Sequence, residues 1–406
     1  MAEGLLVKFQ SLIAFAALVA AAAPARAQKQ YDTGASDTEI RIGNTAPYTG
    51  GAAAYGVIAE TEAAYFNMLN AHGGVNGRKI VFITYDDAYN PTKTVEQTRK
   101  LVESDNVLAV FSALGAAPNL AVAPFLNEKK VPQLFVASGL GAFAEPKTWP
   151  WTMGFQPAYA TEARIYARYI LDNKPDAKIA VLAQNDDFGR ESVKALKAAL
   201  GAKAGQIVAE ATYESTDPTI DAPLAVLRAA QPDVLVDFST PRAAIQTIRR
   251  MAELNWKPLH ILHSVSQSIG AVMKVAGAEN AQGVVSATYY KDPDDPAWSD
   301  DAGLKAWNAF MDGWMPGRDR HNVLYVYGYN AAQILERVLR NAGDDLTRAN
   351  VMKQAASLKN ERLDMVLPGV VINTASDDYA PLKQMQMQRF NGATWERFGP
   401  LVGGAQ

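Results

Sequence analysis

The stretch IRIGNTAPYTGGAAAYG (residues 40–56), continued by LNAHGGVNGRKIVFITYDDAYNPTKT (residues 69–94), decides the fold. Each part contains a short apolar run, and residues 57–71 between the two runs have the amphipathic pattern of a helix. The glycines of HGGVNG permit the positive φ values of a tight turn into the second run. The Asn-Pro pair at 90–91 is a helix start signal, with Asn as the cap. The order strand, helix, strand, helix is typical of a parallel sheet covered by helices.

The same alternation continues along the chain and predicts two αβ arrays in series. The first array has the expected strands EIRIGNTAP, KIVFITYDD, VLAVFSALG and VPQLFVASG, with helices over residues 57–71, 91–104 and 118–128. The pattern restarts after residues 149–157, with the expected strands KIAVLAQND, QIVAEATYE, DVLVDFST and LHILHSV and helices over residues 190–200, 218–230 and 241–254. The predicted fold class is α/β, with two Rossmann-like lobes of parallel strands flanked by helices.

The last part of the chain departs from this regular order. A strand-like segment over residues 283–291 precedes helices near residues 304–312 and 323–341. The segment MQMQRFNGATWERFG then alternates apolar and polar residues about Asn391-Gly392, which predicts a hairpin.

Residues 1–27 have the three-part form of a secretory signal. Lys8 supplies the positive charge, LIAFAALVAAAA is the apolar stretch, and Ala25-Arg26-Ala27 is a small-x-small cleavage site. Because the apolar stretch is short, a membrane span is not expected, and a retained interfacial anchor is the alternative. Cleavage after Ala27 predicts a soluble protein of the periplasm.

Composition bounds the class of partner. After cleavage about 380 of the 406 residues remain, enough for two domains of about 100–200 residues each. With 0 Cys and 49% hydrophobic residues, the core is expected to form without disulfides. A formal net charge of -3 gives no footprint for nucleic acid or acidic membranes. A small molecule is the expected partner.

In an open αβ sheet, ligands bind beyond the carboxyl ends of the strands. Small and polar residues gather at the expected strand ends, where they could equally serve as turns and caps. Six loops of this kind in two arrays favour a cleft between two facing lobes: residues 47–51, 112–117, 138–141, 185–189, 239–240 and 263–268.

The sequence offers no pattern for catalysis or for a metal. Asp86 and Asp87 are neighbours on a strand and point to opposite faces, so a structural role is expected for them. His260 and His263 flank a strand at a spacing of three and have no carboxylate cluster in the sequence beside them. No G-x-S-x-G elbow, P-loop or dinucleotide fingerprint occurs. We therefore expect no enzyme, no cofactor and no metal.

The quoted stretch resembles the start of the periplasmic solute-binding proteins of the branched-chain amino acid type, also called type I periplasmic binding proteins. The resemblance continues through VPQLFVASG, NDDFGRE, PDVLVDFSTP and VYGYNAAQILERVLRNAG and covers nearly the whole chain after residue 27. It implies two lobes joined by three crossings, with a ligand that drives closure and a membrane permease of the ABC class that receives it. By the same resemblance, residues 28–156 and 290–380 form the first lobe, and residues 157–289 and 381–406 form the second. A monomer is expected.

The resemblance also places individual residues. Tyr55 falls where the family sets an aromatic side chain against the ligand, and Ala116 falls where amino-acid binders use a hydroxyl residue. Phe188 takes the place of a frequent Tyr. The acidic partner of an α-ammonium aligns near Val265, where no acid is present. Because a buried ammonium without a carboxylate is costly, an α-amino acid is disfavoured.

The remaining pocket candidates are apolar or aromatic, with a few hydroxyl donors, as a small hydrophobic ligand needs. We expect an aromatic or other hydrophobic carboxylate, held by backbone N–H groups after Gly115 and Gly139. Phe143 and Ser264 belong to the wider set of candidates. The expected ligand-binding residues are Tyr55, Leu114, Ala116, Ala117, Ser138, Gly139, Leu140, Tyr159, Phe188, Thr240, Val265 and Ser266.

Other functions stay open at this point. Within transport, branched-chain amino acids, amides and urea are alternative ligands. A ligand-sensing receptor module could use the same fold, and an exported hydrolase would need a nucleophile with a base or a metal cluster.

Overall fold

The computed structural model describes residues 29–403, so the expected signal over residues 1–27 lies outside the described part of the chain. The first sheet has five parallel strands in the order β3-β2-β4-β5-β6. Its strands are β2 (Glu39–Ala46), β3 (Lys79–Asp86), β4 (Ala109–Phe111), β5 (Gln133–Val136) and β6 (Thr152–Gly154). Its helices are α2 (Gly56–Ala71), α3 (Pro91–Glu103) and α4 (Ala116–Glu128).

The second sheet has seven strands in the order β14-β13-β11-β10-β9-β7-β8. Five are parallel: β7 (Ile179–Gln184), β8 (Ile207–Tyr213), β9 (Val234–Phe238), β10 (Leu259–Leu262) and β11 (Val285–Thr288). The hairpin of β13 (Gln384–Phe390) and β14 (Trp395–Gly403) adds two antiparallel strands. The helices are α5 (Tyr159–Asn173), α6 (Asp187–Leu200), α7 (Asp221–Ala229), α8 (Pro241–Glu253) and the short α9 (Lys274–Ala276).

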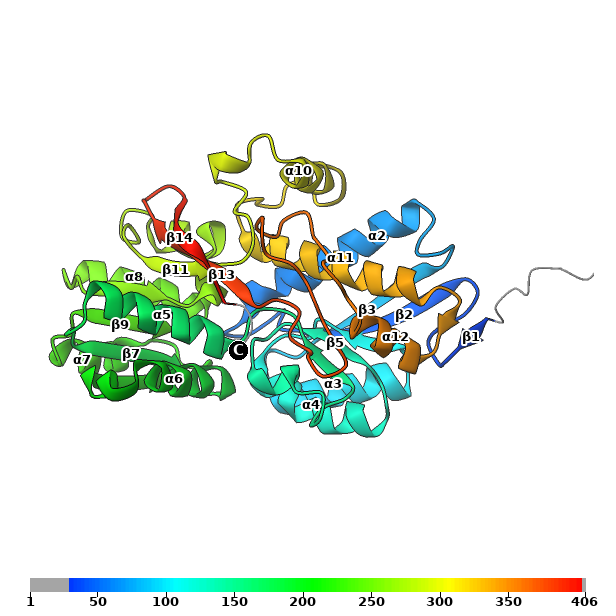
Figure 1. Ribbon diagram of the computed structural model, residues 1–406, viewed down its shortest axis with the longest axis horizontal. Coiled ribbons are helices and arrows are strands. Elements are labelled where there is room, and N and C mark those ends of the chain that lie inside the picture. Colours follow the sequence, from blue (N-terminus) through cyan, green and yellow to red (C-terminus); the bar gives the residue numbers. More distant parts are fainter. Residues whose placement is uncertain (1–28, 404–406) are drawn as a thin grey trace, which may run out of the picture.

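The chain passes between the two arrays three times (Figure 1). It leaves the first sheet after β6 and the second after β11, and it returns to the second at β13. Between the last two passages lie α10 (Ala302–Trp314), α11 (Val323–Ala342) and α12 (Arg348–Ala355), and the small strand β12 (Asp345–Leu346) pairs with β1 (Gln30–Tyr31). The predicted α/β class with two helix-flanked parallel sheets is confirmed. The predicted lobe boundaries remain a prediction.

Local signals explain several element ends. Asn90 caps α3 by accepting hydrogen bonds from the backbone N–H groups of Thr92 and Lys93, and Pro91 occupies the first turn. The predicted terminal hairpin is confirmed, but its loop contains the four residues between β13 and β14 instead of the Asn-Gly pair alone. Strands β1, β6 and β12 and helices α5 and α12 were not predicted, and the three strands have only two or three residues each.

Helix α11 closes the first array by packing against α2 (Figure 1). The two helices approach closely because Gly328 has no side chain. A Cβ atom at this position would lie 2.5 Å from the carbonyl oxygen of Ile58 and 2.9 Å from Cβ of Thr61. On the opposite face of the sheet, α3 and α4 cover a second apolar cluster that includes Leu101, Val110 and Leu126.

Replacing Gly328 with Ala should lower the free energy of unfolding by about 1–3 kcal/mol, because α2 and α11 must separate to admit the methyl group. Gly313→Ala in α10 is the matched control, since nothing lies within 4 Å of its added Cβ. That change should leave stability unchanged or raise it by about 0.5–1 kcal/mol. Urea unfolding of both variants measures the difference, and equal effects would contradict the close helix contact.

Candidate functional site

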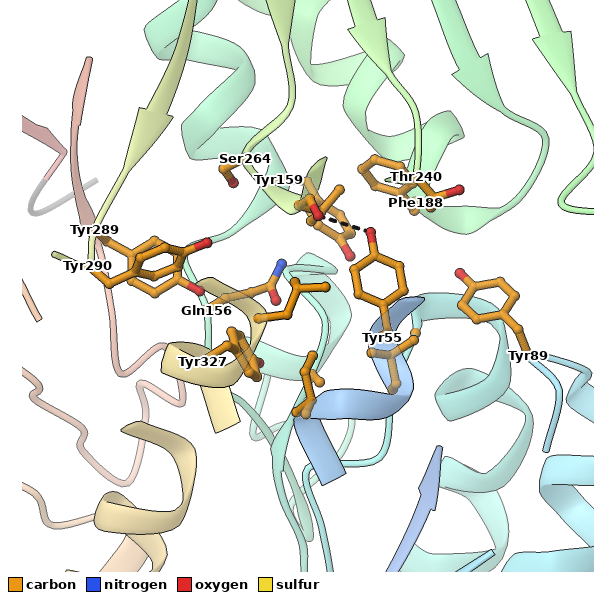
Figure 2. Close-up of a pocket in the computed structure, with 16 residues that line it drawn as sticks. Tyr55, Tyr89, Gln156, Tyr159, Phe188, Thr240, Ser264, Tyr289, Tyr290 and Tyr327 are labelled. Atoms are coloured by element: carbon orange, nitrogen blue, oxygen red, sulfur yellow. Dashed lines mark hydrogen bonds between the residues drawn. The ribbon is translucent and has the colours of Figure 1, made fainter. Parts of the chain in front are cut away.

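A cavity lies where the loops after the strands of the two sheets meet (Figure 2). It contains about 600 Å³ of empty space, part of it open to solvent. Pockets for small molecules are about 300–1,000 Å³, so the cavity suits a small molecule and not a peptide. Its lining residues are Tyr55, Ile58, Tyr89, Leu114, Gly115, Ala137, Gln156, Tyr159, Phe188, Thr240, Ser264, Val265, Tyr289, Tyr290, Leu324 and Tyr327.

Strand ends and helix starts position most of this wall. Tyr55 belongs to a 3-10 turn between β2 and α2, and Tyr159 is the first residue of α5. Thr240 precedes α8 as its N-cap, and Val265 lies in the 3-10 turn η4 (Ser264–Ser266) after β10. Tyr327 differs, because it lies within α11, which the second crossing brings back to the first array. The cavity is therefore walled by both arrays and by a late helix.

None of the sixteen lining residues carries a charged side chain. Seven are aromatic, and Tyr159 and Phe188 pack with ring centroids 4.9 Å apart. Behind them, His263 lies 4.9 Å from Phe188 between ring centroids, and burial lowers its pKa to about 3. The wall is thus aromatic and neutral.

Six of the residues expected to bind a ligand line this cavity: Tyr55, Leu114, Tyr159, Phe188, Thr240 and Val265. They come from both arrays, as the prediction of a cleft between two lobes requires. Ser264, from the wider set of candidates, also lines it. Contact of these residues with a ligand remains a prediction.

The other six do not line the cavity: Ala116, Ala117, Ser138, Gly139, Leu140 and Ser266. Two hydroxyls among them already have protein partners. Ser138 Oγ lies 3.1 Å from the Tyr159 hydroxyl, and Ser266 Oγ donates to the carbonyl of Ser239 at 2.6 Å. Phe143, from the wider set, is fully buried in the core.

The expected anion site after Gly139 is wrong, because its backbone N–H groups are occupied. The N–H of Leu140 donates to Ser138 Oγ at 3.2 Å, and that of Gly141 donates to Glu191 at 2.9 Å. Gly115 differs, because it lines the cavity directly before α4. A Cβ atom there would lie 2.5 Å from a ring carbon of Tyr89, so the start of α4 is beside that ring.

Sequence reasoning missed eight lining residues: Ile58, Tyr89, Ala137, Gln156, Tyr289, Tyr290, Leu324 and Tyr327. Tyr89, Tyr289 and Tyr290 follow strands β3 and β11, so an aromatic residue just beyond a strand end was an available signal. Leu324 and Tyr327 of α11 had no such signal in the sequence, because only the path of the chain brings that helix to the cavity.

Several hydrogen bonds join the arrays across the cleft. The Tyr55 hydroxyl donates to the carbonyl of Val265 at 3.1 Å, and the Tyr89 hydroxyl donates to Asp186 at 2.8 Å. Another is the bond from the Gly141 N–H to Glu191. Burial raises the pKa of both acceptor carboxyls. The cleft is therefore closed in this structure.

A buried acid supports the turn that carries Val265. The Glu162 carboxyl accepts hydrogen bonds from the backbone N–H and the hydroxyl of Ser264, each at 2.6 Å, and from the Tyr166 hydroxyl. Nε2 of His263 lies 3.3 Å from it. Burial raises the pKa of Glu162 to about 7. This acid lies behind the cavity wall and is not part of it.

Residues 29–403 contain neither a candidate metal site nor a helix that could span a membrane. No group of three or more His, Cys, Asp or Glu side chains in that range could hold a metal ion. No helix in the same range is both long and apolar enough to span a membrane. His260 and His263 each have one carboxylate neighbour, Asp237 and Glu162 respectively.

Comparison with known proteins agrees with this geometry. The family described as "Periplasmic binding protein" matches residues 39–394. Leu/Ile/Val-binding protein homolog 1 of Brucella abortus is 26% identical over 362 residues, which cover 84% of this chain and 91% of that protein. Homolog 3 of Brucella melitensis is 28% identical over 219 residues, so the match spans only 53% of that relative.

Solved structures show the same fold. A branched chain amino acid ABC transporter structure from Thermus thermophilus, with bound valine, superposes with a TM-score of 0.82. The match covers 91% of this chain and 98% of that chain at 17% identity. The expected arrangement of two Rossmann-like lobes with three crossings is confirmed.

The Glu162 pKa gives a pH prediction. A folded-state pKa of about 7, raised from 4.5, means that the stability contributed by protonated Glu162 is fully present below about pH 4.5. It is lost as the pH rises through about 7, and amounts to on the order of 3 kcal/mol. Glu162→Gln should remove this loss in urea unfolding between pH 4.5 and 7.5.

Glu128→Gln, at an exposed position of α4, controls for the loss of one surface charge. It should keep the wild-type dependence on pH. Parallel pH curves for wild type and Glu162→Gln would contradict the assignment.

Proposed function

Because the chain belongs to the periplasmic binding protein family and has its type I fold, we propose that it captures a small hydrophobic or aromatic carboxylate in the cleft and delivers it to an ABC permease. The first lobe would comprise residues 28–156 and 290–380, and the second residues 157–289 and 381–406. The cleft between them is the cavity described above. Binding without chemistry is what the family implies.

One observation carries the choice of ligand: no charged side chain lines the cavity. The relatives named for Leu, Ile and Val are similar to this chain, but an α-amino acid brings an ammonium group into the cleft. Without a carboxylate against it, that buried charge costs several kcal/mol. Glu162 does not supply the carboxylate, because it lies behind Ser264 and its oxygens already accept bonds from protein groups.

The aromatic wall favours an apolar or aromatic body for the ligand. Tyr159 and Phe188 offer ring faces, and aromatic pairs contribute about 0.5–1.5 kcal/mol beyond the area they bury. The N–H of Gly115 already donates to the carbonyl of Ala137, and Pro118 has no N–H. A carboxylate would therefore accept from the N–H groups of Ala116 and Ala117, which follow the lining residue Gly115 and which no side chain caps. This assigns the anion end of the ligand to the side of the cavity near Tyr89.

Closure of the cleft is the conformational change that accompanies ligand binding. The bonds of Tyr55 to Val265 and of Tyr89 to Asp186 form only when the two arrays meet. A ligand stabilises this state only to the extent that it contacts both sides better when the cleft is closed. A neutral aromatic ring between Tyr55 and Phe188 meets that requirement, because these residues come from different arrays.

The proposal predicts a ligand series. Benzoate-type or phenylpropanoid acids should raise the melting temperature, and calorimetry should show that Phe188→Ala weakens their binding by about 10–100-fold, equivalent to about 1.4–2.7 kcal/mol. Phe125→Ala, on the outer side of α4 beside Arg99, is the matched control and should bind as wild type does. If leucine-like amino acids alone raise the melting temperature, the ligand class is wrong while the binding role stands.

A further inference from the structure

The hydroxyl groups of the cavity wall fall into two sets. Those of Tyr55, Tyr89 and Tyr159 already have partners: the carbonyl of Val265, the carboxylate of Asp186 and the hydroxyl of Ser138. The residue Tyr327 is only 6% exposed, and its buried hydroxyl has no hydrogen-bond partner. Buried polar groups are nearly always paired, so this hydroxyl calls for an explanation.

Other polar groups with free hydrogen-bonding capacity lie on the same side of the cavity as Tyr327. Figure 2 shows Gln156 on the same side of the cavity as Tyr289, Tyr290 and Tyr327, with no hydrogen bond drawn from Gln156, Tyr289 or Tyr327 to the other lining residues. Tyr290 accepts from Gln267 Nε2 at 2.8 Å, which leaves its own proton free to donate. Tyr89, beside the start of α4, lies on the opposite side of the view. The polar groups with free hydrogen-bonding capacity thus lie at the end of the cavity away from the proposed carboxylate.

The chemistry of these groups selects a partner. Tyrosine O–H groups donate, while the Gln156 amide both donates and accepts. A ligand hydroxyl can accept from Tyr327 and donate to the Gln156 carbonyl oxygen, whereas a carboxylate only accepts and an apolar group does neither. Since no charged side chain lines the cavity, a neutral group can complete the set.

We infer that Tyr327, Tyr289 and Gln156 form a subsite for a ring hydroxyl, so that the ligands of this protein are hydroxylated aromatic acids. This rests on the proposed function, whose carboxylate lies at the other end of the cavity. Tyr55, Tyr159 and Phe188 then hold the ring between the two polar ends.

Calorimetry with 4-hydroxybenzoate, benzoate and phenol tests the subsite on wild type, Tyr327→Phe, Gln156→Leu and Tyr325→Phe. Wild type should bind 4-hydroxybenzoate about tenfold or more tightly than benzoate, because a site built to bond a hydroxyl rejects the analogue without it. In Tyr327→Phe and Gln156→Leu the ratio should fall below about threefold, because 4-hydroxybenzoate loses its hydroxyl partner. Tyr325→Phe, on the same helix but outside the cavity, should keep the wild-type ratio.

The outcomes separate the subsite from the proposed function. Equal binding of 4-hydroxybenzoate and benzoate to wild type would overturn the subsite and leave the function standing. Binding of phenol without either acid would support the subsite and overturn the carboxylate. If none of the three binds, both are wrong.

Unfolding of the free protein gives a second readout. Tyr327→Phe should melt at the wild-type temperature or above, because it removes a hydroxyl that has no partner. A clear fall in melting temperature would show that this hydroxyl is bonded within the protein, which would also overturn the subsite.

Discussion

The hydrogen bond from Tyr55 to the carbonyl of Val265 spans the cleft, and much of the site depends on it. Its acceptor lies in a short turn after β10, which by itself has little reason to hold one position. Glu162 fixes that turn from behind by accepting from both the N–H and the hydroxyl of Ser264. The contact that closes the cleft is thus supported by a buried acid that never meets the ligand. The ionisable group, Glu162, lies behind the cavity wall, and the lining residues themselves carry no charge.

This separation explains how one cavity combines polar groups with an apolar ligand. Hydroxyls such as those of Tyr55 and Tyr89 serve closure, because their bonds run between the two arrays. The hydroxyl of Tyr327 serves no bond within the protein. Tyr55 and Tyr89 are therefore assigned to closure of the cleft and Tyr327 to recognition of the ligand, although all three are tyrosines that line the cavity.

The sequence allowed most of the architecture to be predicted, because alternation and caps are local. Asn90 and Pro91 marked the start of α3, and all eight strands expected before residue 266 were found. Half of the expected site residues reached the cavity, since strand ends converge in any parallel sheet. Ser138 and Ser266 did not, because which hydroxyl is already bonded depends on tertiary neighbours. Tyr327 and Gln156 could not be found, because their places follow from the crossings.

The crossings have a consequence for biosynthesis. Tyr65 on α2 donates to Glu336 on α11, which is 271 residues later in the chain. The first sheet therefore cannot bury its α2 face until most of the polypeptide has been made, and contacts this remote in sequence form slowly. The topology that builds the cleft therefore also postpones completion of the first array until α11 has been made.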